Sequence, residues 1–198
     1  MQIINCQQNS PEWYKLRLGI PTASNFDKIV TSTGEPSKQR TKYLWQLAGE
    51  RVSGVIEESY QNANMQRGTM MQEEAKKFYE IVNGVIVNEV GFCTEDGLKY
   101  GCSPDGLIDN DGGLEIKCPT IAVHVGYLIN KVVPTEYIQQ IQGNLFVTGR
   151  EWWDFLSYYP GLKPLLIRVT PDEKFFKAFE KEINIFNAEL DSICEIIA

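Results

Sequence analysis

Residues 103–119 constrain the fold of this chain more than any other stretch, because they set charged side chains at fixed spacings around a turn. An acid, Asp105, precedes a short expected strand, and Glu115 and Lys117 follow on a returning strand. Alternate residues of a strand point to one face, so we expect Glu115 and Lys117 to face one site while Ile116 packs behind them. Two carboxylates beside a lysine can hold a hard divalent cation and hydrolyse a phosphodiester. The alternative is a surface hairpin with scattered charges, since Glu-x-Lys alone is common.

The length and composition predict one domain spanning residues 1–198, in which 43% hydrophobic residues allow a substantial core. The sequence contains no run of eighteen apolar residues, and its first residues lack the basic and apolar regions of a secretion signal. The five cysteines are scattered and His124 is the single histidine. This pattern argues against a zinc or iron–sulfur site and indicates a reducing cytoplasm.

The charge is unevenly distributed, although the net value of −7 at first argues against a nucleic-acid partner. Residues 1–54 hold seven basic and four acidic residues, a net of +3, so the rest of the chain carries −10. A basic N-terminal portion can bind a phosphate backbone locally. The alternative is that Lys38, Arg40 and Lys42 are only solvent-exposed charges at the start of a helix.

The order of the expected elements indicates a three-layer α/β domain, a central mixed β-sheet flanked by helices. The cap residues are Ser10, Thr22 and, less clearly, Thr135. Helices are expected over residues 10–18, 22–30, 40–52, 64–81, 120–130, 135–147 and 171–196. Strands are expected over residues 85–92, 98–102, 106–109, 114–118, 152–158 and 165–169.

Two further features have simple structural interpretations. The aromatic residues near Trp152 could stack on bases, but alternating aromatics on a strand indicate a core and an interface. His124 has no companion side chains for a metal site, so we expect a structural or surface position.

The charged residues of the hairpin match a known catalytic signature. Asp105, Glu115 and Lys117 resemble the active-site triad of the PD-(D/E)XK nucleases, which have a restriction-endonuclease-like core. Within that superfamily the chain is similar to the lambda-exonuclease, or YqaJ-type viral recombinase, branch. The similarity is carried in order by four segments, which are Trp13 to Ser24, Arg67-Gly68 with the following acidic helix, residues 103–119, and Tyr137 to Gln142.

This resemblance implies a Mg²⁺-dependent exonuclease, with Mn²⁺ as a possible substitute, that digests the 5′-ended strand of double-stranded DNA. Such enzymes leave a 3′ single-stranded overhang for phage-type recombination by single-strand annealing. The lambda-type members form ring-shaped homotrimers and work with an annealing protein. The expected setting is the cytoplasm of a bacterial host cell, with a phage or prophage gene. The alternatives are a structure-specific endonuclease of the same fold and a weakly active DNA-end-binding protein.

The resemblance assigns metal and catalytic roles to the hairpin. Asp105 and Glu115 are expected to ligate Mg²⁺ together with the main-chain carbonyl of Ile116, because magnesium keeps several waters and needs few protein oxygens. Lys117 is expected to orient or deprotonate the attacking water and to offset charge in the transition state. The alternative for Lys117 is a structural ion pair with Glu115.

A second group of residues matches positions that the family uses to hold the DNA 5′-phosphate. These residues are Arg17, Ser24, Ser103 and Gln140. An arginine with hydroxyl and amide donors suits a terminal phosphate. The alternatives are that Ser24 is an ordinary early-helix residue and that Gln140 faces solvent.

The chain departs from the family pattern at Gln72, where the family has a glutamate that ligates metal. An amide is a poorer Mg²⁺ ligand than a carboxylate. The neighbouring Glu73 points about 100° away on a helix and cannot replace it without a local shift. Three interpretations remain open, namely a natural variant, a register shift that presents Glu73, and an introduced substitution that traps substrate. The departure bears on catalytic rate more than on fold.

Overall fold

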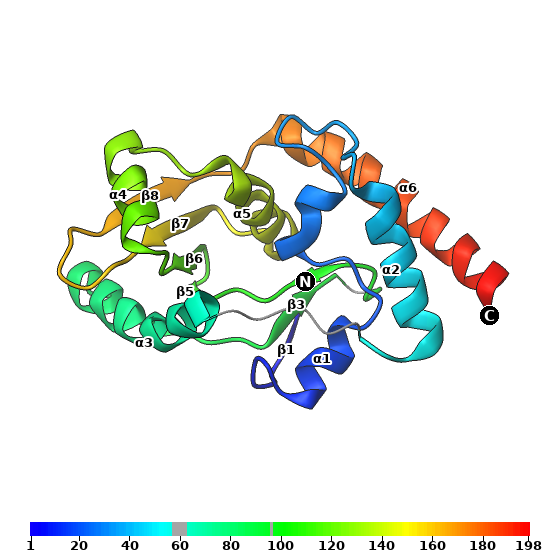
Figure 1. The fold of residues 1–198 in the computed structure, drawn as a ribbon, viewed down its shortest axis with the longest axis horizontal. Coiled ribbons are helices and arrows are strands. Elements are labelled where there is room, and N and C mark those ends of the chain that lie inside the picture. The colour runs from blue at the N-terminus through cyan, green and yellow to red at the C-terminus, as the bar shows by residue number, and fades with distance from the viewer. Residues whose placement is uncertain (57–62, 96) are drawn as a thin grey trace.

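The computed structural model describes residues 1–56, 63–95 and 97–198, without the side chains of 63–69. Within these residues, five strands form a central sheet, three short strands form a second sheet, and helices surround both (Figure 1). The elements are β1 (Gln2–Ile4), α1 (Pro11–Arg17), the 3₁₀ helix η1 (Ala23–Lys28), α2 (Arg40–Ser53), α3 (Ala63–Asn83), β2 (Val87–Asn88), β3 (Phe92–Thr94), β4 (Gly101–Cys102), β5 (Gly106–Ile108), β6 (Gly112–Lys117), α4 (Ile121–Asn130), α5 (Thr135–Thr148), β7 (Trp152–Ser157), β8 (Leu165–Val169) and α6 (Glu173–Ile197).

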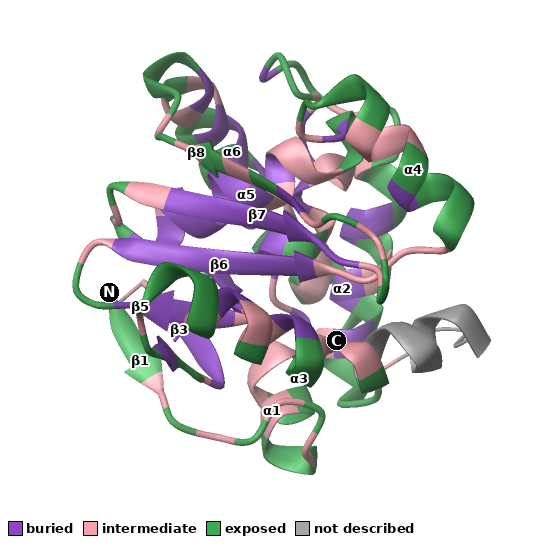
Figure 2. Ribbon diagram, turned by 90° about the vertical axis from the view of Figure 1, so that its left-hand side faces the viewer, coloured by how far each residue is buried: buried purple, intermediate pink, exposed green. Residues whose placement is uncertain are grey.

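The central sheet has the strand order β2-β5-β6-β7-β8, which places β6 in its middle. Strands β6 and β7 run parallel, whereas the other neighbouring pairs run antiparallel. Figure 2 shows β6 and β7 buried along most of their length. The expected fold class, a central mixed sheet flanked by helices, is confirmed.

Two helices cover opposite faces of this sheet. Trp153 and Phe155 of β7 pack in one apolar cluster with Ile141 of α5. The next residue along β7, Leu156, points the other way and packs in a second cluster with Tyr79 of α3. The alternating strand residues therefore fill two separate cores, and the two aromatics belong to the core as expected.

The two glycines that open β6 allow the tryptophans of β7 to pack closely against it. A Cβ atom at Gly112 would lie 2.1 Å from the ring of Trp152, and one at Gly113 would lie 2.3 Å from the ring of Trp153. Any larger residue at either position would clash with these rings. The Gly-Gly pair therefore serves packing as well as the turn.

The expected strand over residues 85–92 is wrong, because the chain divides it between two sheets. Val87–Asn88 pairs with β5 in the central sheet, whereas Phe92–Thr94 pairs with β1 and β4 in the second sheet. The break falls at Gly91, where a Cβ atom would lie 2.4 Å from the main-chain oxygen of Cys6. The N-terminal strand β1, which the sequence pattern did not indicate, thus redirects this part of the chain.

The expected helix caps are partly correct. Ser10 caps α1 by accepting a hydrogen bond from the main-chain N–H of Trp13 at 3.2 Å. Thr22 precedes a 3₁₀ helix rather than an α-helix, and its side chain makes no capping bond because its hydroxyl accepts from Arg17. Thr135 is the first residue of α5, and Pro134 occupies the cap position.

The closing helix α6 packs along α2 (Figure 1). Its aromatic side chains contact both α2 and η1. Phe186 contacts Tyr43 of α2, with ring centroids 5.8 Å apart, and Phe179 contacts Phe26 of η1 at 4.5 Å. Among the described residues, no helix has the length and apolar character needed to cross a bilayer.

Candidate active site

The returning strand β6 presents its acid and its lysine to the same side of the sheet. The Lys117 Nζ lies 2.6 Å from Glu115 Oε1. Ile116 between them points to the opposite face, where it belongs to the apolar cluster beneath α3. The expected shared face of Glu115 and Lys117 is therefore present, and it lies under α5.

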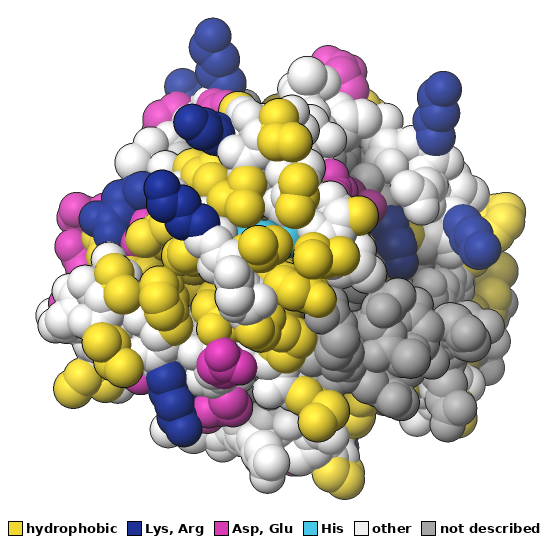
Figure 3. Space-filling view, turned by 60° about the vertical axis from the view of Figure 1, so that its left-hand side comes forward, with side chains coloured by type: hydrophobic (Ala, Val, Ile, Leu, Met, Phe, Trp, Pro, Cys, Tyr) yellow, Lys and Arg dark blue, Asp and Glu magenta, His cyan; other side chains and the backbone are white. Residues whose placement is uncertain are grey.

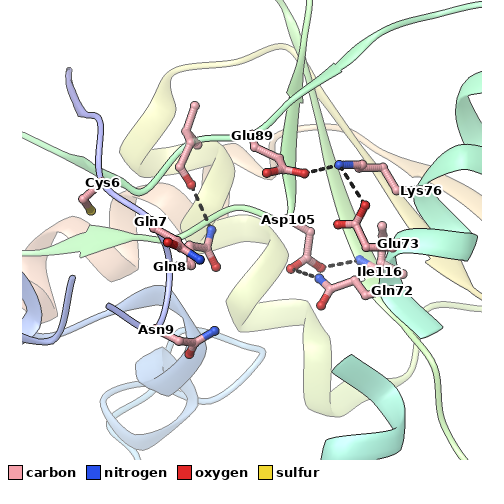
Figure 4. A pocket seen from close by; sticks show the side chains of 11 residues that line it. Cys6, Gln7, Gln8, Asn9, Gln72, Glu73, Lys76, Glu89, Asp105 and Ile116 are labelled. Atoms are coloured by element: carbon pink, nitrogen blue, oxygen red, sulfur yellow. Dashed lines mark hydrogen bonds and ion pairs between the residues drawn. The ribbon is translucent and has the colours of Figure 1, made fainter. Parts of the chain in front are cut away.

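Asp105 is held at the start of β5 by two short hydrogen bonds. Its Oδ2 accepts from the main-chain N–H of Ile116 at 2.6 Å, and its Oδ1 accepts from Gln72 Nε2 at 2.6 Å. Figure 4 shows both bonds converging on the carboxylate from β6 and from α3. These bonds tie the first acid of the hairpin to the strand that carries the second.

Glu115 is almost fully buried, with 2% of its surface exposed, and α5 satisfies its carboxylate. Gln140 donates from Nε2 to Oε1 at 2.7 Å, and Asn144 donates from Nδ2 to Oε2 at 3.1 Å. Gln140 also accepts from Lys117 Nζ at 3.2 Å, and this ammonium lies 4.8 Å from the ring centre of Tyr137. Sequence reasoning missed Tyr137 and Asn144 as site residues, although positions 137, 140 and 144 share one face of a helix.

Burial and like charge shift the protonation of the first acid. Desolvation, with Glu115 nearby, raises the pKa of Asp105 to about 7. Burial alone would lower the pKa of Lys117, but the charges of Glu115 and Asp105 outweigh it and raise that pKa. Lys117 is therefore a cation at neutral pH in this arrangement. This favours a role in orienting water and offsetting charge over a role in removing a proton.

The donor set at this position fits a hard divalent cation. Asp105 and Glu115 supply carboxylate oxygens, the ligands that magnesium prefers, and two carboxylates leave coordination sites for water. Burial, and after it the charge of Glu115, raises the pKa of Asp105, and a bound cation would favour its ionised form. Across the described residues, no group of three or more His, Cys, Asp or Glu side chains is placed to hold a metal ion.

The helix α3 directs the amide of Gln72, rather than the carboxylate of Glu73, to Asp105. The Glu73 side chain is 65% exposed and pairs with Lys76 at 3.5 Å, and Lys76 also pairs with Glu89 (Figure 4). Arg67 and Gly68 precede this part of α3, but their side chains lie outside the described residues. The amide that replaces the family glutamate at position 72 is therefore in direct contact with Asp105.

A cavity of about 250 Å³ opens beside Asp105, and sequence reasoning missed it. Its walls are the N-terminal segment of residues 6–9 and the side of α3 that carries Glu73 (Figure 4). Gln8 fastens this segment by donating to the main-chain oxygens of Val90 at 2.9 Å and Pro104 at 2.8 Å. No local pattern marks such a wall, because it depends on contacts between residues about 90 positions apart.

Three of the four residues assigned to the 5′-phosphate lie together. Arg17 donates to Ser103 Oγ at 3.1 Å and lies 3.4 Å from Ser24 Oγ. Two neighbours that were not assigned to the phosphate, Thr22 and Trp13, complete this cluster, which we call the Arg17 group. Thr22 accepts from Arg17 at 3.2 Å, and Trp13 stacks on the guanidinium at 4.2 Å while donating to Ser103 at 2.8 Å.

The fourth residue, Gln140, lies apart from this group, because its side-chain amide bonds both Glu115 and Lys117. Only one residue, Pro104, separates Ser103 from Asp105, so the Arg17 group and the carboxylates share one stretch of chain.

The single histidine has a structural position, one of the two positions that the sequence led us to expect. His124 is buried between Ser157 Oγ at 2.7 Å and the main-chain oxygen of Lys163 at 3.0 Å.

The fold and site define a member of the PD-(D/E)XK class, and comparison with known proteins gives the family. The YqaJ-like viral recombinase domain family matches residues 12–151, so the chain belongs to this family. The chain is similar to the crystal structure of an alkaline exonuclease, LHK-Exo from Laribacter hongkongensis. The two are 35% identical with a TM-score of 0.86, over 95% of this chain and 96% of that one. A second crystal structure, of LHK-Exo in complex with dAMP, matches with the same values.

Two more distant relatives extend the comparison. A phage related exonuclease from Haemophilus somnus 129PT has a TM-score of 0.73 over 92% of this chain and 98% of that one, but only 13% identity, and so shows the fold alone. The uncharacterized protein R354 of Acanthamoeba polyphaga mimivirus is 29% identical over 165 residues, or 76% of this chain. The chain spans only 29% of the length of that relative.

The raised pKa of Asp105 predicts how the stability of the metal-free protein depends on pH. Because this pKa is about 7 in the folded protein and about 4 in an unfolded chain, the folded state holds a proton that the unfolded state releases. The resulting stabilisation is present at low pH and is lost as the pH rises through about 7. Asp105→Asn lacks the titrating group, so the free energy of unfolding of the wild type should fall relative to this variant between about pH 4 and 7 and level off above that. Urea unfolding with a chelator measures both, and parallel pH profiles would contradict the assignment.

Proposed function

We propose that the chain is a Mg²⁺-dependent exonuclease that hydrolyses the 5′-ended strand of double-stranded DNA. The observation that carries the proposal is that Glu115 and Lys117 pair under α5 while Asp105 bonds the main chain at Ile116 between them. Asp105 also lies two residues along the chain from Ser103 of the Arg17 group. The likeness to an alkaline exonuclease at 35% identity over nearly the whole chain supports it. The 3′ overhang left by such digestion is the substrate of recombination by single-strand annealing.

Each part of the site has a distinct task in this reaction. Asp105 and Glu115 would hold the cation, which would supply Lewis-acid chemistry toward the phosphodiester and the attacking water. Lys117, a cation beside Glu115, stabilises the charge that develops on the phosphoryl oxygens. Gln140 links Lys117 to Glu115 and so keeps the ammonium beside the carboxylates.

The Arg17 group explains how an end would be chosen over an internal position. A guanidinium with the hydroxyls of Ser24 and Ser103 offers several charge-assisted donors to one terminal phosphate. Trp13 stacks on the guanidinium at 4.2 Å and so fixes the direction of its planar fork of donors. A 5′-phosphate bound here would place the next phosphodiester bond beside the two carboxylates.

The remaining assignments are proposed on the family resemblance. The partners are double-stranded DNA ends, further copies of the chain in a ring-shaped homotrimer, and a single-strand annealing protein. Mn²⁺ is expected to substitute for Mg²⁺. The gene belongs to a phage or prophage, and the enzyme acts in the cytoplasm of the bacterial host.

A second candidate, a weakly active DNA-end-binding protein, is favoured by one observation. Gln72 meets Asp105 with an amide N–H at 2.6 Å, so it acts as a donor to the carboxylate rather than as a further ligand. The metal position that the family glutamate serves is thereby weakened, while the Arg17 group is intact.

A digestion assay on defined DNA tests the proposed function. Linear duplex DNA with 5′-phosphates is labelled at the 5′ or the 3′ end and incubated with the protein and Mg²⁺, with a covalently closed circle as control. We expect progressive loss of the 5′-ended strand and an intact circle. Cleavage of the circle would indicate an endonuclease, and tight end binding without digestion would favour the second candidate.

Removing the guanidinium should abolish the preference for phosphorylated ends. Arg17→Ala loses the charge-assisted bonds to the terminal phosphate, so the advantage of 5′-phosphate over 5′-hydroxyl DNA in kcat/KM should shrink by about 10-fold or more. Lys15→Ala, an exposed charge on the same helix, is the matched control and should keep the preference. An unchanged preference in Arg17→Ala would move the phosphate site elsewhere.

Restoring the family carboxylate at position 72 should strengthen the dependence on metal. Gln72→Glu adds a ligand beside Asp105, so the Mg²⁺ concentration for half-maximal digestion should fall and the maximal rate should rise. The control is Glu73→Gln, which changes an exposed carboxylate paired with Lys76 and should behave like the wild type. The interpretation fails if Gln72→Glu is slower at every Mg²⁺ concentration, or if Glu73→Gln abolishes digestion.

A further inference from the structure

Asn144 is a buried amide of α5 that no sequence motif singled out. Its exposed fraction is 1%, and its Nδ2 donates to Glu115 Oε2 at 3.1 Å. We propose that Asn144 is a positioning residue that orients the Glu115 carboxylate for the divalent cation. This inference rests on the function proposed above, because it takes Glu115 as a metal ligand.

The partners of Glu115 divide between its two oxygens. Oε1 contacts Lys117 at 2.6 Å and Gln140 at 2.7 Å, and both of these side chains have tasks toward water or DNA. Lys117 also has 24% of its side chain exposed, so it is free to turn toward substrate. Oε2 contacts Asn144 alone among the described hydrogen bonds. Asn144 is therefore the partner of Oε2, on the opposite side of the carboxylate from Lys117 and Gln140, and it fixes the rotation of that carboxylate.

The rest of the core fixes the position of Asn144. The preceding residue, Gly143, approaches η1 so closely that a Cβ atom there would lie 2.4 Å from the ring of Phe26. The following residue, Leu145, is fully buried. Thr148 donates to the main-chain oxygen of Asn144 at 2.7 Å. Asn144 is thus held by packing that does not depend on the site, which lets it set the rotamer of Glu115.

The chemistry of an amide suits this task. A buried carboxylate needs hydrogen-bond donors, and leaving one oxygen without a partner is unfavourable. A neutral amide satisfies the oxygen without cancelling its charge, so the attraction of Glu115 for a cation is kept. Outer-shell partners of metal ligands typically change metal affinity by about 10–100-fold when removed.

A direct metal-binding measurement tests the proposal. Mn²⁺ is titrated into the metal-free full-length protein by calorimetry, for the wild type and for Asn144→Leu, which keeps the volume but removes the donor. We expect Mn²⁺ to bind about 10–100-fold more weakly to the variant. The matched control is Gln142→Ala on the same helix, since this buried amide donates to the main-chain oxygen of Thr170 at 3.0 Å. Its thermal stability should drop while its Mn²⁺ affinity stays at the wild-type value.

The outcomes separate this inference from the proposed function. Wild-type affinity in Asn144→Leu, or an equal loss in Gln142→Ala, would overturn the positioning role. If Asn144→Leu does not fold, Asn144→Ser is titrated instead, because its short hydroxyl cannot span the distance to Oε2 and the same loss is expected. If the wild type binds no Mn²⁺ but digests DNA, the metal assignment of Glu115 fails, and the role of Asn144 fails with it; a loss of the Asn144 role alone shows as unchanged affinity in a variant of a protein that does bind Mn²⁺. Binding of 5′-phosphorylated ends without metal should be equal in all variants.

Discussion

Two carboxylates within one hairpin, Glu115 buried and Asp105 partly buried, are the constraint on which this structure depends. Asp105 and Glu115 repel each other in a medium of low dielectric, and each would be destabilising without compensation. The fold answers with one cation, Lys117, and with amide donors from α3 and α5. The balance is incomplete, since burial, and after it the charge of Glu115, still raises the pKa of Asp105. A divalent cation would complete that balance, which links the stability of the hairpin to its chemistry.

The same stretch of chain couples the chemistry to the recognition of an end. Ser103 contacts Arg17, and Asp105 lies two residues further on. Pro104 between them is fastened by Gln8, so the N-terminal segment also forms part of the site wall. Side chains of α1, of α3 and of the N-terminal segment thus meet along residues 103–105. A phosphate bound by Arg17 would be held at a fixed distance from the carboxylates.

The sequence predicted those parts of the site that depend on local periodicity. The shared face of Glu115 and Lys117 follows from the two-residue repeat of a strand, and the helices and most strands follow from similar patterns. Contacts between distant segments could not be read in this way. The strand at residues 85–92 breaks where Gly91 meets the N-terminal segment, and no pattern within those residues shows that contact. Gln140 has a different neighbourhood from the expected one because α5 crosses directly over β6.

The central claim is that Asp105 and Glu115 together hold one divalent cation. Anomalous diffraction from crystals soaked in Mn²⁺ tests it most directly, because it locates the ion without relying on activity. The account predicts an anomalous peak within coordination distance of carboxylate oxygens from both residues. A fully active enzyme whose Mn²⁺ lies elsewhere, or contacts neither carboxylate, would contradict it.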